Sequence, residues 1–283
     1  MPISLRSAMQ ETLAGWPDDL PPAWRDIVSV VQLGFEAIDP ALTLEPWEPI
    51  FPVRRGKLFP GMPAGAHMFK AFDGIAPDQV RCVILGQDPY PTPDFATGRA
   101  FEAGNVVLWR ELDKMFSKSV RAFIQQIVAA RSGTPDYARS FSDWPAVLDA
   151  IETGAVAFEP AARLAERWVA QGVLLLNSSL TLTRFKVETD PHQSQGHLPL
   201  WRPLLQGVLA ALASMDSPLV FIGFGDVAAE NLRLAGIGEA VDGTRACILR
   251  DHPARADAVL ALENPFLLCN RYLEAMGVEP IAW

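Results

Sequence analysis

The sequence predicts an α/β fold: a single three-layer αβα domain around a central four-stranded, mainly parallel sheet, with a helical N-terminal extension. Four short apolar runs follow residue 80, and their near-continuous apolarity is typical of strands buried on both faces. Helical stretches separate these runs, and strands alternating with helices build parallel sheets that helices cover. A length of 283 residues with 49% hydrophobic residues allows one large core.

The elements follow in order along the chain. Prolines break the first sixty residues, which predict one or two helices, over about 4–14 and 22–38, and then an irregular connection. The predicted strands are Val80–Leu85, Val173–Leu176, Leu219–Ile222 and Ala246–Leu249. The predicted helices between them are Leu108–Ala130, Ala161–Ala170 and Leu200–Met215. We therefore expect an acidic helical extension over 1–50, an α/β domain over 51–283 and a variable helical insertion over 131–160.

Composition narrows the class of protein. No apolar run approaches the roughly 18 residues that span a bilayer, and the N-terminus lacks the pattern of a secretory signal, so we expect a cytoplasmic protein without a membrane partner. The three cysteines, Cys82, Cys247 and Cys269, have no metal-ligand spacing and are expected to be reduced and buried.

The net charge of −9 argues against a nucleic acid partner, because phosphate binding favours a basic surface. The charge is unevenly distributed, however. Residues 1–50 hold eight acids and two bases, so that residues 51–283 have a net charge of only −3. The field near the functional residues therefore matters more than the total.

Polar side chains follow three of the predicted strands. Asp88 and Tyr90 follow the first strand, Asn177 the second and His252 the fourth. Ligands of open parallel sheets bind outside the carboxyl ends of the strands, so we expect these residues to share one edge. Each also has a structural interpretation: Asp88 as a turn or helix cap, Asn177 as an Asx turn, His252 as a structural histidine before proline, and Tyr90 as packed loop. Metal-ligand spacing, a nucleophile elbow and a phosphate-cradling glycine loop are missing, so we expect no metal and no cofactor.

Five ordered segments give a resemblance. They are Val83–Tyr90 (VILGQDPY), Gly98–Phe101 (GRAF), Trp168–Asn177 (WVAQGVLLLN), Leu180-Thr181 and His252-Pro253. Weaker similarity covers Leu58–Phe69, Phe266–Leu273 and the C-terminal Glu279–Trp283 (EPIAW). In this order and spacing the chain resembles uracil-DNA glycosylases of the family-1 type over roughly residues 50–283. The resemblance implies a monofunctional hydrolase of base excision repair, a glycosidase that flips deoxyuridine out of DNA, releases uracil and leaves an abasic site.

The resemblance also implies the role of each residue. Asp88 would orient the attacking water or stabilise the cationic sugar, and His252 would stabilise the departing uracil anion. The uracil-binding residues would be Gln87, Tyr90 against thymine's methyl group, Phe101 stacked on the base, and Asn177 reading its polar edge. The DNA-contacting positions would be Ser178, His192, Gly225 and Arg255.

The chain departs from the family in its DNA-contacting loops. After His252-Pro253 the family has Ser-Pro-Leu-Ser, whose leucine fills the space of the flipped base, whereas this chain has Ala254–Asp257 (ARAD). Arg255, Val259 or Leu260 could take the place of that leucine. Unstacking a base costs a few kcal/mol, so the loss predicts a preference for single-stranded DNA and poor binding of the phage-encoded protein that mimics DNA on this family.

Other functions stay open at this stage. A superfamily glycosylase of broader lesion range is one alternative, although Tyr90 and Asn177 favour strict uracil. A module that binds damaged or single-stranded DNA without cleaving it is another, although it would not need Asp88 and His252. An unrelated α/β nucleotide-binding protein is a third, which the missing phosphate loop disfavours. A monomer is the family expectation.

Overall fold

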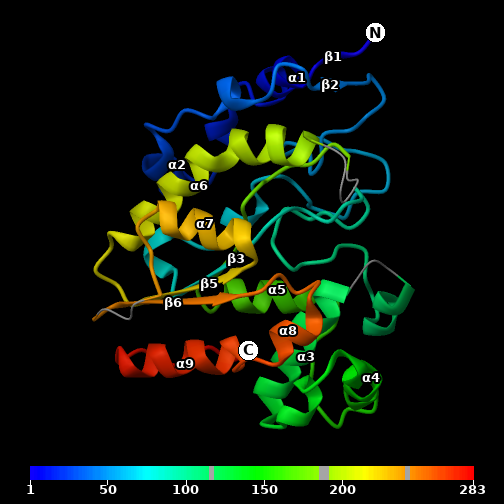
Figure 1. Cartoon of the computed structure of the whole chain (residues 1–283), viewed down its shortest axis with the longest axis vertical. Coiled ribbons are helices and arrows are strands. Elements are labelled where there is room, and N and C mark those ends of the chain that lie inside the picture. Colours follow the sequence, from blue (N-terminus) through cyan, green and yellow to red (C-terminus); the bar gives the residue numbers. More distant parts are fainter. Residues whose placement is uncertain (115–117, 185–190, 240–242) are drawn as a thin grey trace.

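A four-stranded parallel sheet forms the centre of the computed structural model, which describes residues 1–114, 118–184, 191–239 and 243–283 (Figure 1). Its strands are β3 (Cys82–Gly86), β4 (Val173–Asn177), β5 (Leu219–Phe224) and β6 (Arg245–Arg250). They pair in the order β4-β3-β5-β6, and all three pairings are parallel. The four predicted strands are thus confirmed, each within two residues of its predicted ends, because runs this apolar are stable only where both faces are covered.

Successive residues of each strand alternate between two separate hydrophobic cores. On β3, Val83 and Leu85 face one core, whereas Cys82 and Ile84 face the other. Helices α1, α2, α6 and α7 cover the first face, and α3, α5 and α9 cover the second (Figure 1). The expected three-layer arrangement is therefore present. The helices are α1 (Leu5–Thr12), α2 (Pro22–Val28), α3 (Lys118–Ser132), α4 (Trp144–Glu152), α5 (Ala161–Val169), α6 (Leu198–Ala213), α7 (Asp226–Leu234), α8 (Ala256–Leu260) and α9 (Pro265–Ala275).

The first fifty residues pack directly on the sheet layer. Trp24 of α2 is fully buried, its indole Nε1–H donates to the Ile75 carbonyl at 2.8 Å, and its ring meets Phe72 edge-on. A short antiparallel pair, β1 (Ile3–Ser4) with β2 (Thr43–Leu44), closes this segment. The predicted helix over 22–38 is wrong in extent, because α2 ends at Val28 and only a 3-10 turn, Phe35–Ala37, follows. The domain boundary at residue 50 stays a prediction.

The predicted helix over 108–130 is divided. A 3-10 helix spans Trp109–Lys114, residues 115–117 lie outside the described part of the chain, and α3 begins at Lys118. The region 131–160 forms two short 3-10 turns and α4. Its contact with the rest of the fold includes Asp257 at the start of α8, whose Oδ1 accepts the backbone N–H of Phe141 at 3.0 Å.

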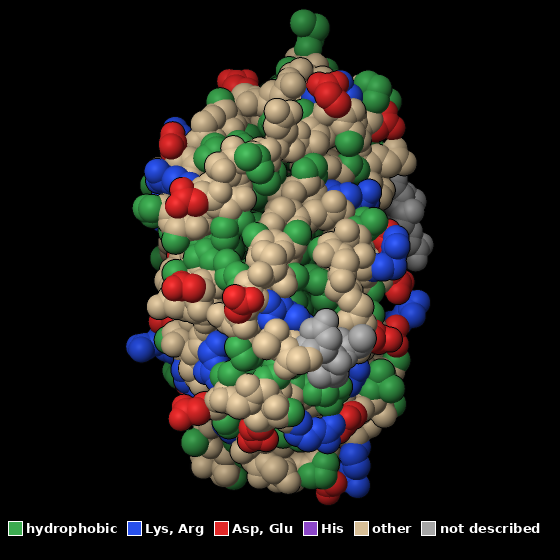
Figure 2. Space-filling model, turned by 90° about the vertical axis from the view of Figure 1, so that its left-hand side faces the viewer, with side chains coloured by type: hydrophobic (Ala, Val, Ile, Leu, Met, Phe, Trp, Pro, Cys, Tyr) green, Lys and Arg blue, Asp and Glu red, His purple; other side chains and the backbone are tan. Residues whose placement is uncertain are grey.

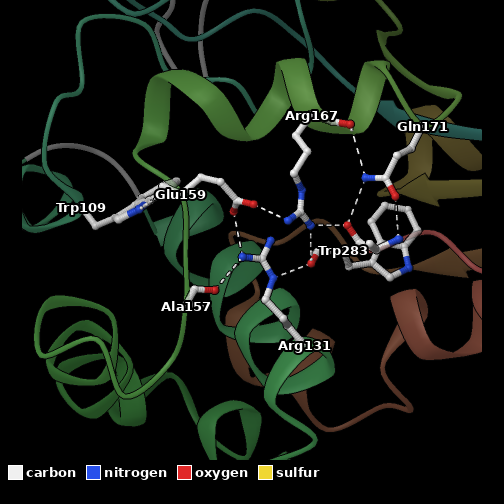
Figure 3. A network of polar contacts seen from close by, with 8 residues as sticks. Trp109, Arg131, Ala157, Glu159, Arg167, Gln171 and Trp283 are labelled. Carbon is white, nitrogen blue, oxygen red and sulfur yellow. Dashed lines mark hydrogen bonds and ion pairs between the residues drawn. The ribbon is translucent and has the colours of Figure 1, made fainter.

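A polar network joins the last residues to α3 and α5 (Figure 3). The Glu159 carboxylate accepts hydrogen bonds from Arg131, at 2.7 Å, and from Arg167. Both arginines also donate to the Trp283 carbonyl, and Gln171 accepts the Ala282 N–H at 2.8 Å. Because Gln171 lies just before β4, this network lies toward the amino ends of the strands, away from the loops that carry the candidate residues.

The surface carries charges of both signs, and the cysteines lie in the interior. On the side that Figure 2 brings to the front, acidic and basic side chains are interspersed, and neither sign gathers into a continuous patch. Within the described ranges, no helix is both long and apolar enough to cross a membrane. All three cysteines are buried and form no disulfide, and the Cys269 thiol donates a weak hydrogen bond to the Cys82 sulfur at 3.8 Å.

Candidate active site

The ends of β3 and β4 bring the first candidate residues together. The parallel register places Gly86 beside Asn177, and the pairing continues beyond the strands, where Ser178 and Ser179 donate backbone N–H groups to the carbonyls of Gly86 and Gln87 at 3.0 and 2.8 Å. The loop after β3 is thereby fixed on the end of β4. Loops after the other strands reach the same edge, as in Figure 1, where β6 leads into the turn before α8.

Gly86 is the point on which Asn177 and Phe101 converge. A Cβ added to Gly86 would lie 2.7 Å from Asn177 Oδ1 and 3.4 Å from Phe101 Cε2. Asn177 is 3% exposed, and its side-chain amide forms no hydrogen bond with any residue that the structure describes. A buried amide without a protein partner is held ready for a ligand, because leaving such a group unpaired costs stability. The sequence places Gly86 in the VILGQDPY motif but does not indicate this role.

Phe101 is fixed from behind by another aromatic ring. Its ring stacks on Phe123 of α3 at a centroid distance of 4.3 Å with the planes 2° apart, and it meets Phe224 of β5 edge-on. The Ala100 N–H donates to the Leu175 carbonyl at 3.1 Å, which ties this segment to β4. Phe101 has a positive φ of 58°, a conformation that non-glycine residues seldom adopt and that clusters at functional sites.

The two oxygens of the Asp88 carboxyl differ in their hydrogen bonds. Gln87 Nε2 donates to Oδ2 at 3.0 Å, and Gln193 Nε2 donates to the same oxygen. Oδ1 is buried and has no hydrogen-bond partner in the described chain. Burial raises the pKa of Asp88 to about 6, and the hydrogen bonds from Gln87 and Gln193 oppose that rise only in part. Such a group is ionised at neutral pH and has an oxygen free to bind water.

The tautomer of His252 follows from its contact. Its Nδ1 accepts the backbone N–H of Ala254 at 3.2 Å, so a neutral ring carries its proton on Nε2. Burial lowers the pKa of His252, which keeps the ring neutral at pH 7. Gly225, with a φ of +89°, packs against this ring, and a Cβ there would lie 3.1 Å from His252 Cβ. The residue is thus a neutral N–H donor in a fixed position.

Tyr90 lies partly buried on the Asp88 loop. Burial and then the nearby Glu102 carboxylate raise the pKa of its hydroxyl, which therefore stays protonated. Glu102 itself contacts Lys70 at 3.3 Å and Arg99 at 3.5 Å, so a buried ion cluster supports this side of the loop. The ring of Tyr90 packs on the same hydrophobic core as Phe101.

The four residues expected to contact DNA differ in their exposure. Ser178 is buried and its hydroxyl donates to the Gly86 carbonyl at 2.8 Å, and His192 is 1% exposed inside a polar cluster, so a DNA contact by either side chain stays a prediction. Gly225 positions His252. Arg255 is solvent-exposed and forms only a loose ion pair with Asp251 at 3.4 Å. Of the candidates for the place of the missing leucine, Val259 and Leu260 are buried, whereas Arg255 is exposed.

The chain is similar in sequence to several known proteins. No protein-family model matches the chain. A uracil-DNA glycosylase of Exiguobacterium sibiricum is 30% identical over 224 residues, which are 78% of this chain and 83% of that protein. The chain belongs to the uracil-DNA glycosylase family. Other members are a Pediococcus pentosaceus protein, 30% identical over 77% of each chain, and a Corynebacterium efficiens protein, 27% identical over 94% of this chain and 92% of its own.

Solved structures share the glycosylase fold. The wild-type UNG of Nitratifractor salsuginis aligns with a TM-score of 0.61 at 23% identity, covering 94% of this chain and 96% of its own. A mimivirus UNG variant in complex with UGI aligns with a TM-score of 0.60 at 17% identity, covering 96% and 94%. These alignments include most of the first fifty residues. In the described part of this glycosylase-family chain, no group of three or more His, Cys, Asp or Glu residues could hold a metal ion.

Proposed function

We propose that this chain is a monofunctional glycosylase that hydrolyses the N-glycosidic bond of deoxyuridine in DNA, releasing uracil and leaving an abasic site. The observation that carries the proposal is the arrangement of polar groups at one sheet edge. Asp88 Oδ1 is buried without a hydrogen-bond partner among the described residues, Asn177 carries a buried amide, and His252 carries an N–H donor. Membership of the uracil-DNA glycosylase family supports it.

The proposed chemistry needs a negative charge beside the sugar. Glycosidic cleavage passes through an oxocarbenium-like state, which the ionised Asp88 stabilises electrostatically. Its free Oδ1 accepts a hydrogen bond from the attacking water, whose oxygen bonds to the anomeric carbon as the bond to the base breaks. The electron pair of that bond leaves with uracil, and the Nε2–H of His252 donates to the charge that develops on the base. The water proton passes to solvent by way of the carboxylate.

The choice of base rests on two side chains. The amide of Asn177 accepts from N3–H of uracil and donates to O4, whereas cytosine presents the opposite pattern and leaves both groups unpaired. Tyr90 occupies the position of thymine's C5-methyl group and rejects it sterically. Phe101, backed by Phe123, stacks on the flipped base with its remaining face, and Gln87 adds a backbone contact.

The proposed grip on DNA is weak. Arg255 is an exposed basic residue of the loop after His252, and it is paired with Asp251. We infer a preference for single-stranded substrate and poor binding of the phage DNA-mimic inhibitor, because that inhibitor holds the same loops. A monomer acting in the cytoplasm completes the proposal.

Oligonucleotides carrying U, T, hypoxanthine or U·G, incubated with EDTA and cleaved by alkali, test the activity. Cleavage confined to uracil supports the proposal. Release of hypoxanthine would favour a broader glycosylase, and binding without cleavage, unchanged in Asp88→Asn, would favour a binding module.

Strand preference has a separate test. Arg255→Leu puts a large apolar side chain on an exposed position of this loop, next to the position of the family's leucine, so turnover on a U·A duplex should rise relative to single strands, with Arg271→Leu as a distant surface control. Wild-type turnover on duplex equal to that on single strands would contradict the weak grip.

A further inference from the structure

We propose that Gln193 is a positioning residue for Asp88, which, together with Gln87, fixes the carboxyl group so that Oδ1 alone is left for the attacking water. This inference rests on the proposed function. Gln193 lies 105 residues from Asp88 in sequence, and its side-chain Nε2 donates to Asp88 Oδ2. The Nε2 of Gln87 donates to that same oxygen at 3.0 Å.

Two donors on one oxygen have a geometric consequence. A carboxylate held by a single bond can rotate about its Cβ–Cγ bond and exchange its two oxygens. Here Gln87 approaches from the loop of Asp88 itself and Gln193 from a separate element, so rotation would break both bonds. Oδ1, buried and without a partner in the described chain, is the oxygen that remains. A fixed hydrogen-bond acceptor accelerates the reaction more than a mobile one, because it is already oriented toward the water before the reaction begins.

The element that carries Gln193 is itself locked by a buried chain of hydrogen bonds. Gln193 lies in a π-helical turn, His192–His197, that continues into α6. His192 Nδ1 contacts Thr183 Oγ1 at 2.9 Å, and Thr183 Oγ1 contacts His197 Nε2 at 3.2 Å. His197 Nδ1 in turn contacts Thr181 Oγ1 at 2.9 Å.

The directions of these bonds are determined by residues that can only donate. Arg184 Nη2 lies against His192 Nε2, so that nitrogen accepts and Nδ1–H donates to Thr183. The hydroxyl of Thr183 then donates to His197 Nε2, and His197 Nδ1–H donates to Thr181. Burial, with a smaller effect of His192, lowers the pKa of His197 to about 3, so this ring is neutral. The turn is thus held at both ends, and Gln193 has a fixed origin from which to reach Asp88.

The charged surroundings of Asp88 make the effect measurable. Titratable side chains on the adjoining elements are Tyr90 on its own loop, His252 after β6, and His192 and His197 on the π-helical turn. Tyr90 stays protonated, and burial lowers the pKa of both His252 and His197. Donors to a carboxylate stabilise its charged form, so loss of Gln193 should raise the pKa of Asp88 above its present value of about 6.

The test compares Gln193→Leu, which keeps bulk without a donor, with Gln195→Ala, a change to an exposed side chain in the same turn. In Gln193→Leu the acidic limb of the kcat profile should move up by about half to one pH unit, so that kcat at pH 6 falls roughly two- to fivefold while KM changes little. Gln195→Ala should follow the wild type, and circular dichroism melting checks that both variants fold. Superimposable profiles for the two variants would overturn the inference.

A second measurement separates this inference from the proposed function. NMR titration of the Asp88 carboxyl carbon reports its pKa without any turnover. A higher pKa in Gln193→Leu than in wild type supports the positioning contact, and an unchanged pKa refutes it, whether or not the wild type releases uracil. An inactive wild type would instead count against the proposed function alone.

Discussion

The substitution Gly86→Ala should damage the reaction far more than the fold. Gly86 ends β3, and its α-carbon faces the amide of Asn177 and the ring of Phe101. An added Cβ would lie 2.7 Å from Asn177 Oδ1, 3.3 Å from Ala100 Cβ and 3.4 Å from Phe101 Cε2. Only the first distance is shorter than carbon and oxygen tolerate, so Asn177 must move while its neighbours shift by a few tenths of an ångström.

The magnitude follows from the size of that displacement. Moving the amide oxygen to an ordinary contact needs about 0.5 to 1 Å, and misplacement by 1 Å can cost about 100-fold in rate. Overpacking by one methyl group in a filled interior costs about 1–3 kcal/mol. We therefore expect kcat/KM for uracil to fall about 100-fold, while the free energy of unfolding falls by no more than about 3 kcal/mol.

A matched control is available on the neighbouring strand. A Cβ on Gly223 of β5 would lie 2.7 Å from Leu232 Cδ1 and 3.1 Å from Leu249 Cδ2, on the opposite face of the sheet from Asn177. Gly223→Ala should thus cost comparable stability and leave uracil release within a few-fold of wild type.

Uracil release from a single-stranded oligonucleotide gives kcat/KM for both variants, and urea unfolding gives their stability. The reasoning would be refuted if Gly86→Ala retained wild-type activity, or if Gly223→Ala lost as much activity as Gly86→Ala at equal stability.

Three further predictions concern the site. Burial raises the pKa of Asp88 to about 6, so the folded state keeps that proton to higher pH than the unfolded state, and the contribution of Asp88 to the free energy of unfolding falls as pH rises from about 4 to 6. Asp88→Asn should therefore lose at least about 100-fold in kcat yet gain about 1 kcal/mol of stability at pH 7.5. A variant that is less stable than wild type in thermal unfolding would contradict this. Asn177→Ala removes both contacts to the uracil edge and should lower kcat/KM about 100-fold, whereas a loss below fivefold in oligonucleotide cleavage would show that the amide does not read the base. Tyr90→Ala should make thymine release detectable while uracil release falls about tenfold, and a variant that stays blind to thymine would place the methyl group elsewhere.

Sequence predicted the parts of this molecule that local pattern determines. The strands were found because a run such as Val173–Leu176 is too apolar for any exposed face. Asp88, Asn177 and His252 were placed at one edge because parallel strands end together. The helix over 108–130 was predicted as continuous because periodicity reports which face is apolar and does not report where the backbone changes from a 3-10 to an α conformation.

Other features depend on contacts that no local pattern encodes. Gln193 gives no signal, since a glutamine in a polar stretch is ordinary and its partner lies 105 residues away. Ser178 and His192 were expected at the DNA surface from the resemblance alone, and a matching motif does not report that both side chains are buried. Gly86 lies within the VILGQDPY motif, but the motif does not show that Asn177 and Phe101 occupy the space that a side chain at this position would fill.

The order β4-β3-β5-β6 has a consequence for how the molecule reaches its native state. Strand β3 pairs with segments 91 and 138 residues later in the chain, and the site combines loops from residue 86 to residue 252. Contacts so distant in sequence form slowly, because loop closure precedes any gain in stability. Helical signal should therefore recover early on refolding, and uracil release should recover last. Activity in this chain then reports completion of the entire sheet, which no helical signal can do.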